Sequence, residues 1–155
     1  MEMRDVLGYF SYKYYGDNFK ILTAIERKEK VSDEQIQAFH KRIKYDFFTI
    51  VDDNYPEMLK HVNNPPIVMF YQGDMSLIHE DNEIIAKETI DGVRMIHAYE
   101  TNITNRGIEM KSVMACECHE DMDMLVDKMH QAQETLKNIL SIVPVKEAKE
   151  KSFER

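Results

Sequence analysis

The side chains best suited to chemistry gather around Cys116, Cys118 and His119. Two thiols and an imidazole at such short spacing could hold Zn²⁺ or Cu⁺, because these ions prefer soft ligands. The chain has no other cysteine to complete a tetrahedral site, however. Cys116 and Cys118 also alternate in step with Met110 and Met114, a pattern typical of buried, unreactive thiols. We therefore expect neither a metal nor any other cofactor.

The same residues do not form a pattern typical of nucleophilic catalysis. Cys118 and His119 are adjacent in sequence, and adjacent residues of a strand point to opposite faces of the sheet. The remaining histidines are scattered singly, in no order that suggests a catalytic triad. We therefore predict that the protein is not an enzyme.

Cysteine usage and the lack of long apolar segments favour the cytoplasm. Cys116 and Cys118 are too close in sequence for an unstrained disulfide, so we expect reduced thiols. The first residues include two acids and no apolar run, which differs from a secretory signal. No apolar run reaches the roughly 18 residues that a membrane span needs. We expect a cytoplasmic protein without membrane contact.

A group of basic residues in the first third of the chain could contact phosphate groups. The candidates are Arg27, Lys28, Lys30, Lys41, Arg42 and Lys44. The chain as a whole has 20 Lys and Arg against 28 Asp and Glu, a formal net charge of -8, whereas nucleic-acid binders usually depend on a basic surface. The basic residues support binding of single-stranded DNA, and the acidic net charge opposes it, so we keep DNA binding as the alternative function. Tyr12, Tyr14 and Tyr15 are the candidates for base stacking.

The elements that must position these residues begin with helices. Apolar residues recur at helical spacing over residues 6–14, and Asp17 or Asn18 can cap a second helix. The apolar stripe of that helix is Phe19, Leu22 and Ile25. Ser32 and Gln35 then form a capping box, which predicts the first turn of a third helix.

Strand patterns follow the helices. Residues 47–51 and 67–71 are apolar runs rich in β-branched and aromatic residues, which predict buried strands. The second of these strands needs neighbours on both sides, so we expect it inside a sheet. Residues 83–90 and 93–99 predict a hairpin around an Asp-Gly turn, and residues 108–118 alternate as a further strand.

The last expected helix, over residues 122–143, carries apolar residues at alternating steps of three and four. They are Met122, Leu125, Met129, Ala132, Leu136, Ile139 and Val143. Such a seam is typical of a coiled coil, although a helix that packs on a small sheet uses a similar stripe. The candidate interface with a protein partner or a second copy comprises Met122, Leu125, Met129, Leu136 and Ile139.

Together these elements predict an α+β protein. It would consist of an N-terminal helical segment, a short mixed sheet, and one or more C-terminal β-hairpins covered by a long helix. The expected domains are a helical one at residues 1–46 and a small α+β sheet domain at residues 47–145. Residues 146–155 are rich in Lys and Glu and predict a charged, solvated tail.

An ordered set of motifs follows the first predicted strand. The set comprises Tyr55-Pro56, Leu59, Pro65-Pro66, the apolar residues 67–71 and Gly73-Asp74. Its order and spacing resemble the DNA-processing protein A (DprA/Smf) family. The helical residues 1–46 are similar to the small N-terminal helical domain of that family. The resemblance therefore covers residues 1–78.

The resemblance implies a link to DNA uptake and to recombination mediators. The family's Gly-Ser-Arg loop, which forms part of its single-stranded DNA site, has no counterpart in this sequence. We therefore predict a non-enzymatic, DprA-like interaction module that acts in or against DNA processing, recombination or competence through protein–protein contacts. Those contacts, with a protein partner or with a second copy, would involve the helix at residues 122–143.

Overall fold

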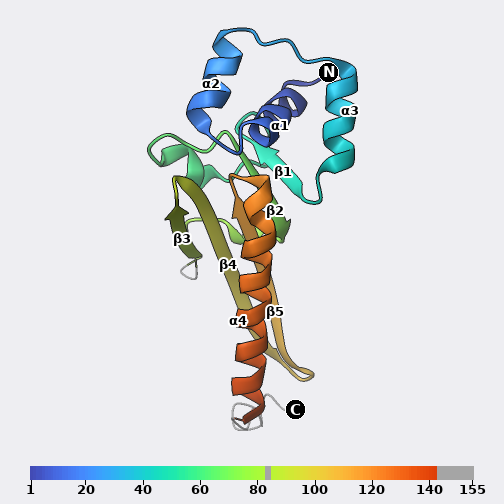
Figure 1. Cartoon of the computed structure of the whole chain (residues 1–155). Helices are drawn as coiled ribbons and strands as arrows, with labels where there is room; N and C mark the ends of the chain where they lie inside the picture. The colour runs from blue at the N-terminus through green and yellow to red at the C-terminus, as the bar shows by residue number, and fades with distance from the viewer. Residues whose placement is uncertain (83–84, 143–155) are drawn as a thin grey trace.

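Figure 1 shows the computed structural model of the chain, which describes residues 1–82 and 85–142. Three helices lie together at one end of the molecule, and a long fourth helix runs along the sheet below them. The helices are α1 (Met3–Lys13), α2 (Asn18–Glu26), α3 (Asp33–Arg42) and α4 (Met122–Ile142). The strands are β1 (Asp46–Thr49), β2 (Val68–Gly73), β3 (Ile85–Ile90), β4 (Val93–Thr104) and β5 (Gly107–Cys116). The predicted α+β class is confirmed.

Local capping signals determine where α2 and α3 begin. The Asp17 carboxylate accepts a hydrogen bond from the Lys20 backbone N–H at 3.1 Å, which confirms one of the two caps considered. At α3, the Ser32 hydroxyl accepts from the Gln35 N–H, and the Gln35 side-chain oxygen accepts from the Ser32 N–H. The predicted capping box is therefore present in full.

The buried face of α2 differs from the predicted apolar stripe. Ile21 and Ala24 are buried and join Phe10 in one core cluster, whereas Phe19 is 77% exposed and Leu22 is 50% exposed. Apolar residues occur on both sides of this short helix, so hydrophobic periodicity alone does not distinguish its inner side. Packing against α1 selects the side with Ile21 and Ala24.

The five strands form one sheet in the order β1-β2-β5-β4-β3. All four pairings are antiparallel. The predicted mixed sheet is therefore wrong. A parallel pair needs a crossover, usually through an α-helix. The connection from β1 to β2 instead carries the short 3-10 helix η1 (Glu57–His61). β2 has a neighbour on each side, as predicted.

The predicted hairpin turn between β3 and β4 is confirmed. Asp91 and Gly92 both have positive φ angles, 52° and 81°. Two such central residues define the turn type whose twist matches that of a hairpin. Ile90 and Val93 close the ladder on either side of this turn.

Apolar side chains cover both faces of the upper part of the sheet. The cluster on the helical side includes Phe47, Phe70, Met114 and Cys116 from the strands, with Leu7, Phe10 and Met122 from the helices. The cluster on the opposite side includes Phe48, Met69, Val113 and Ala115, with Tyr55, Leu59, Leu77 and Ile78 over them. Because successive strand residues alternate between faces, a single apolar run supplies both clusters.

Two strands extend beyond this shared core. β3 pairs with β4 only up to Ala98, and β2 pairs with β5 only from Val113 onward. Residues 99–112 therefore form a two-stranded ladder, which we name the arm, and α4 runs alongside it (Figure 1). Within the described part of the chain, neither α4 nor any shorter helix is long and apolar enough to cross a membrane.

Candidate functional site

The two thiols identified from the sequence lie inside the protein. Cys116 is fully buried and Cys118 is 5% exposed. Burial raises the pKa of Cys116 to about 12, and it also raises the pKa of Cys118. Both thiols are therefore protonated at neutral pH and take part in packing. Across the described ranges, no group of three or more His, Cys, Asp and Glu side chains could hold a metal ion.

His119 is a buried structural histidine. Its Nε2 accepts a hydrogen bond from the Lys44 backbone N–H at 3.0 Å, which requires the neutral ring. The rings of Tyr12, Tyr45 and Phe70 surround it at centroid distances of 5.3, 5.4 and 4.9 Å. Burial lowers its pKa, although Asp123 opposes that effect. His119 therefore connects the segment before β1 with the start of α4.

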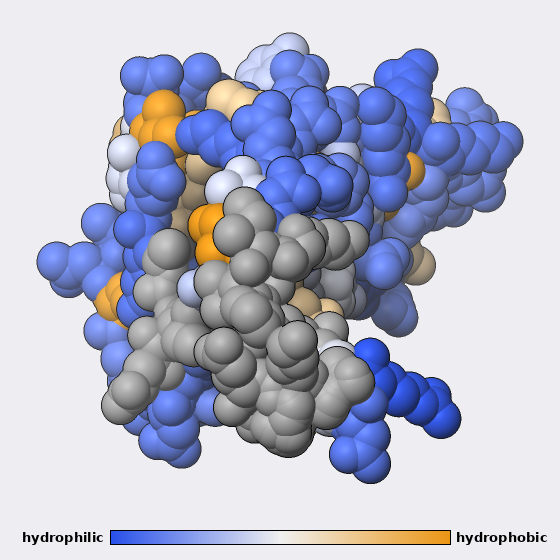
Figure 2. All heavy atoms as spheres, turned by 90° about the horizontal axis from the view of Figure 1, so that it is seen from below, coloured by the Kyte–Doolittle hydropathy of each residue, from blue (hydrophilic) through white to orange (hydrophobic). Residues whose placement is uncertain are grey.

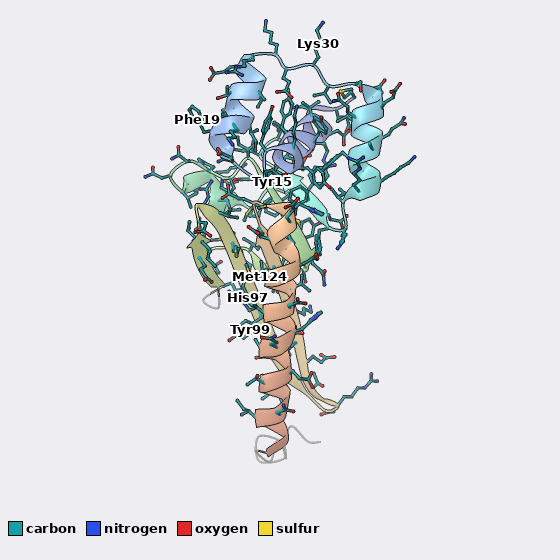
Figure 3. All side chains as sticks on the ribbon, viewed as in Figure 1. Tyr15, Phe19, Lys30, His97, Tyr99 and Met124 are labelled. Atoms are coloured by element: carbon teal, nitrogen blue, oxygen red, sulfur yellow. The ribbon has the colours of Figure 1, made fainter. Side chains whose placement is uncertain are left out.

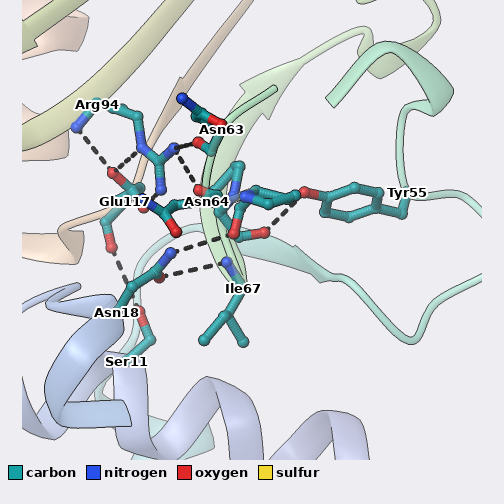
Figure 4. Close-up of polar contacts among 10 residues, drawn as sticks. Ser11, Asn18, Tyr55, Asn63, Asn64, Ile67, Arg94 and Glu117 are labelled. Atoms are coloured by element: carbon teal, nitrogen blue, oxygen red, sulfur yellow. Dashed lines mark hydrogen bonds and ion pairs between the residues drawn. The ribbon is translucent and has the colours of Figure 1, made fainter. Parts of the chain in front are cut away.

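An ion pair between the half-buried Arg94 and the buried Glu117 lies at the junction of the helices and the sheet (Figure 4). Arg94 Nε donates to Glu117 Oε1 and Nη2 donates to Oε2, both at 2.8 Å. The remaining guanidinium nitrogen, Nη1, donates to the carbonyl of Asn64 at 2.6 Å and to that of Asn63 at 3.3 Å. This arrangement, which we name the clamp, ties β4 and the end of β5 to the loop before β2.

The corner between α1 and α2 closes over the same place. Ser11 Oγ donates to the Glu117 carbonyl at 3.3 Å, and Asn18 Nδ2 donates to the Pro65 carbonyl at 3.1 Å (Figure 4). Gly16 approaches so closely that a Cβ there would lie 2.4 Å from the Glu117 carbonyl oxygen. The sequence did not indicate the clamp or these contacts, because their partners are far apart along the chain and follow no periodic pattern.

The Tyr55-Pro56 pair has a structural role. Tyr55 is 4% exposed, and its hydroxyl donates to the Pro66 carbonyl at 2.7 Å. Its ring lies edge-on to Phe48 at 5.7 Å, and burial raises its pKa. Pro56 precedes η1 directly. The pair therefore holds the loop containing the two prolines against the sheet.

The candidate basic residues fall into two groups, one before α3 and one at its end and just after it. Arg27, Lys28 and Lys30 lie at the α2 end of the connection to α3, whereas Lys41 and Arg42 end α3. The helix between them, Asp33–Arg42, has ten residues, and at about 1.5 Å per residue it is roughly 15 Å long. Figure 3 places Lys30 at the end of the molecule farthest from the arm.

The remaining candidates for DNA contact are partly engaged in other interactions. Lys44 forms an ion pair with Asp123 at 3.2 Å. The Tyr14 hydroxyl donates to Glu29 at 2.6 Å, and Tyr12 packs against His119. Tyr15 is 59% exposed and is the one tyrosine of the three that presents most of its surface.

The predicted seam of α4 divides into a buried and an open half. Met122, Leu125 and Met129 are buried in the chain's own core, so these three side chains present little surface to a partner. Ile139 is 51% exposed. Leu136 lies on the same helix, but its side chain is outside the described ones, and Val143 and the predicted tail at 146–155 lie outside the described residues.

An open groove lies between the lower half of α4 and the arm. It has a volume of about 360 Å³ and is lined mainly by apolar surface. Its walls comprise His97, Tyr99, Met110, Met129, Ala132, Gln133, Thr135 and Ile139. Viewed from the lower end, the molecule is mainly hydrophilic with a few apolar areas (Figure 2). Tyr99 and His97 were not identified from the sequence, although both share the β4 face with the buried Met95.

These features define a small α+β protein in which an antiparallel sheet, covered on both faces of its upper part, carries the clamp and a projecting arm. Residues 46–117 match the family model described as DNA recombination-mediator protein A, so this segment is similar to that family. The match links this segment to DNA processing and recombination. No significant match was found among curated proteins or among solved structures.

The matched segment confirms the predicted resemblance at residues 46–78 and extends beyond its predicted end, to residue 117. It begins at β1, contains the Tyr55-Pro56 pair and ends at Glu117, so both partners of the clamp lie within it. The helices α1 to α3 and the helix α4 lie outside the match. The similarity of residues 1–45 to the family's N-terminal domain stays a prediction.

Proposed function

We propose that this chain is a non-catalytic interaction module that acts in or against DNA processing, recombination or competence through protein–protein contacts. The family match supports a role in DNA processing or recombination, and the groove between α4 and the arm supports protein–protein contact as the way in which the chain acts. The buried, protonated thiols and the neutral His119 support the absence of catalysis. The free thiols Cys116 and Cys118 also fit a cytoplasmic protein.

The observation that carries this proposal is the apolar surface that α4 and the arm leave open. Ile139 on α4 and Ile103 on the arm are 51% and 55% exposed. Tyr99 and Met110 line the groove beside them. A concave surface with aromatic and methionine side chains is typical of an interface that accepts an apolar segment. A second copy or another protein would bury it.

Single-stranded DNA binding is the second candidate, and it rests on the family link. Arg27, Lys28 and Lys30 are exposed near one another in sequence, and Tyr15 is exposed as well. Opposing this, Lys41 and Arg42 lie at the other end of α3, and the net charge is -8. Proteins that bind single-stranded DNA usually have a basic groove along which the phosphate backbone runs. This charge distribution offers only a short basic segment.

One experiment distinguishes the two functions. The anisotropy of a labelled single-stranded oligonucleotide is measured with the protein at low and at physiological salt. We expect no rise in anisotropy at either salt concentration. Salt-sensitive binding that weakens in the Arg27→Ala/Lys28→Ala/Lys30→Ala variant would replace the proposal with DNA binding.

The interaction mode has its own measurement. Light scattering across a range of protein concentrations reports self-association, and we expect Ile139→Asp to reduce it. Met124→Asp is the control, because Met124 is 42% exposed on the same helix and does not line the groove (Figure 3). A mass that stays monomeric would exclude a second copy from the groove and leave a different protein as its partner.

A further inference from the structure

A second apolar surface lies on the helical part of the molecule, away from α4. Phe19 and Leu22 of α2 are 77% and 50% exposed, and Tyr15 just before this helix is 59% exposed. Ile50 and Val51, which follow β1, are 38% and 54% exposed. Figure 3 shows Phe19 pointing outward from α2. Exposed apolar side chains gathered in this way mark interaction sites on soluble proteins.

Tyr15, Phe19, Leu22 and Ile50 border a hollow of about 920 Å³. α2 and Ile50 form its apolar wall, and the loop at residues 63–65 and the β3–β4 turn form the rest. The Arg94–Glu117 clamp holds that loop through the carbonyls of Asn63 and Asn64. The hollow is therefore bounded by fixed backbone, and a partner would bind it at little cost in ordering.

The charges around the hollow indicate the chemistry of its partner. Arg94 and Glu117 neutralise each other, and Lys20 offsets Asp17. Asp91 at the β3–β4 turn is exposed and adds a negative charge at the rim. The whole chain carries a net charge of -8, which disfavours a second copy as the occupant and favours a basic one.

We propose that this hollow docks an amphipathic segment of another protein, with apolar side chains against Phe19 and Leu22 and a flanking Lys or Arg beside Asp91. This inference goes beyond the groove on α4, because no described residue lines both places. With two separate surfaces, the chain would join two proteins.

The test uses two labelled model peptides of the same length, each helical with a leucine face. One carries lysines on its polar face and the other carries glutamates. We expect the lysine peptide alone to bind, and we expect Phe19→Ser/Leu22→Ser to weaken it about tenfold or more, as loss of interface anchors does. Phe19 and Leu22 are exposed, so this variant should unfold at the same denaturant concentration as the wild type.

Two further variants make the result specific to the hollow. Asp91→Asn should weaken the lysine peptide and reduce the salt dependence of its binding, because it removes the acid at the rim. Ile139→Ser, in the α4 groove, should leave the affinity unchanged. Equal affinity for both peptides, or unchanged affinity in Phe19→Ser/Leu22→Ser, would overturn the proposal. A dimer that this double variant dissociates would also overturn it, because a second copy would then occupy the hollow.

Discussion

Arg94 and Glu117 form a bidentate ion pair at the junction of the helices and the sheet, with both Glu117 oxygens accepting hydrogen bonds at 2.8 Å. Glu117 is only 2% exposed. The same guanidinium donates to the carbonyls of Asn63 and Asn64, so one charged pair holds two strands and a loop. Its loss should therefore affect the stability of the whole fold.

We expect Arg94→Met to lower the free energy of unfolding by about 3 kcal/mol, since it leaves the buried Glu117 carboxylate without its counter-charge and with the backbone N–H of residue 94 as its remaining donor. Urea denaturation followed by circular dichroism measures the change. The double variant Arg94→Met/Glu117→Gln should be more stable than Arg94→Met, because no uncompensated charge is left. The control Lys60→Ala removes an exposed ion pair with Glu57, and it should cost less than about 1 kcal/mol. Similar losses for Arg94→Met and Lys60→Ala would contradict this account.

Gly16 and Gly92 offer a matched comparison of two glycines with positive φ. Their φ angles are 78° and 81°, but a Cβ at Gly16 would lie 2.4 Å from the Glu117 carbonyl oxygen, whereas one at Gly92 would meet nothing within 4 Å. Gly92→Ala should cost about 1–2 kcal/mol, the strain of an L-residue in this conformation. Gly16→Ala should cost clearly more, because the backbone must also move. Equal unfolding midpoints in urea would show that the corner between α1 and α2 is loosely packed.

The hydroxyl of Tyr55 should contribute measurably to stability. It donates to the carbonyl of Pro66, a fully buried residue. Tyr55→Phe leaves this carbonyl unsatisfied, which should cost about 1–3 kcal/mol. Tyr9→Phe is the control, because the Tyr9 hydroxyl accepts an exposed hydrogen bond from Gln35. If both variants unfold at the wild-type urea concentration, the Tyr-Pro pair does not hold the loop.

The parts of the fold that could be predicted from the sequence depend on short-range signals. The capping box of Ser32 and Gln35 spans four residues, and the Asp91-Gly92 turn spans two, so their physics is complete within the local sequence. The motifs around Tyr55-Pro56 also indicated the family, because their order along the chain is itself the signal.

The features that could not be predicted depend on long-range packing. Arg94 and Glu117 are 23 residues apart and follow no pattern that links them. The apolar stripe predicted for α2 faces outward, because apolar residues occur on both sides of the helix and only packing shows which side is buried. The apolar pattern of α4 is the same at Met129 and at Ile139, yet Met129 is buried and Ile139 is exposed. The sequence could not predict this difference, because it depends on where the sheet that covers the helix ends.

The thiols Cys116 and Cys118 should react only after unfolding. Burial raises the pKa of Cys116 to about 12 and also raises that of Cys118, and the thiolate is the reactive form. A colorimetric thiol reagent at neutral pH should therefore label neither residue in the native protein and both in denaturant. Rapid labelling of the native protein would mean that the end of β5 opens. The variants Cys116→Ser and Cys118→Ser identify which thiol reacts.

Mild acid should destabilise the fold through His119. Burial lowers the pKa of His119 below its usual 6.5, and its Nε2 accepts the Lys44 N–H, which a protonated ring cannot do. As the pH falls below 6.5, the unfolded chain binds a proton that the folded chain resists. This part of the stability is therefore fully present above pH 6.5 and is lost as the pH falls toward the folded pKa.

The measurement is the urea midpoint at one pH above 6.5 and one below it. His119→Gln keeps an acceptor for the Lys44 N–H but does not titrate, so its midpoint should change less with pH than that of the wild type. His61→Gln is the control, because His61 lies on the surface and its side chain is 69% exposed. The wild type and His61→Gln should show the same pH dependence. If His119→Gln also shows it, then other groups, among them His97, whose pKa burial also lowers, account for the loss of stability in acid, and His119 does not stay neutral on folding.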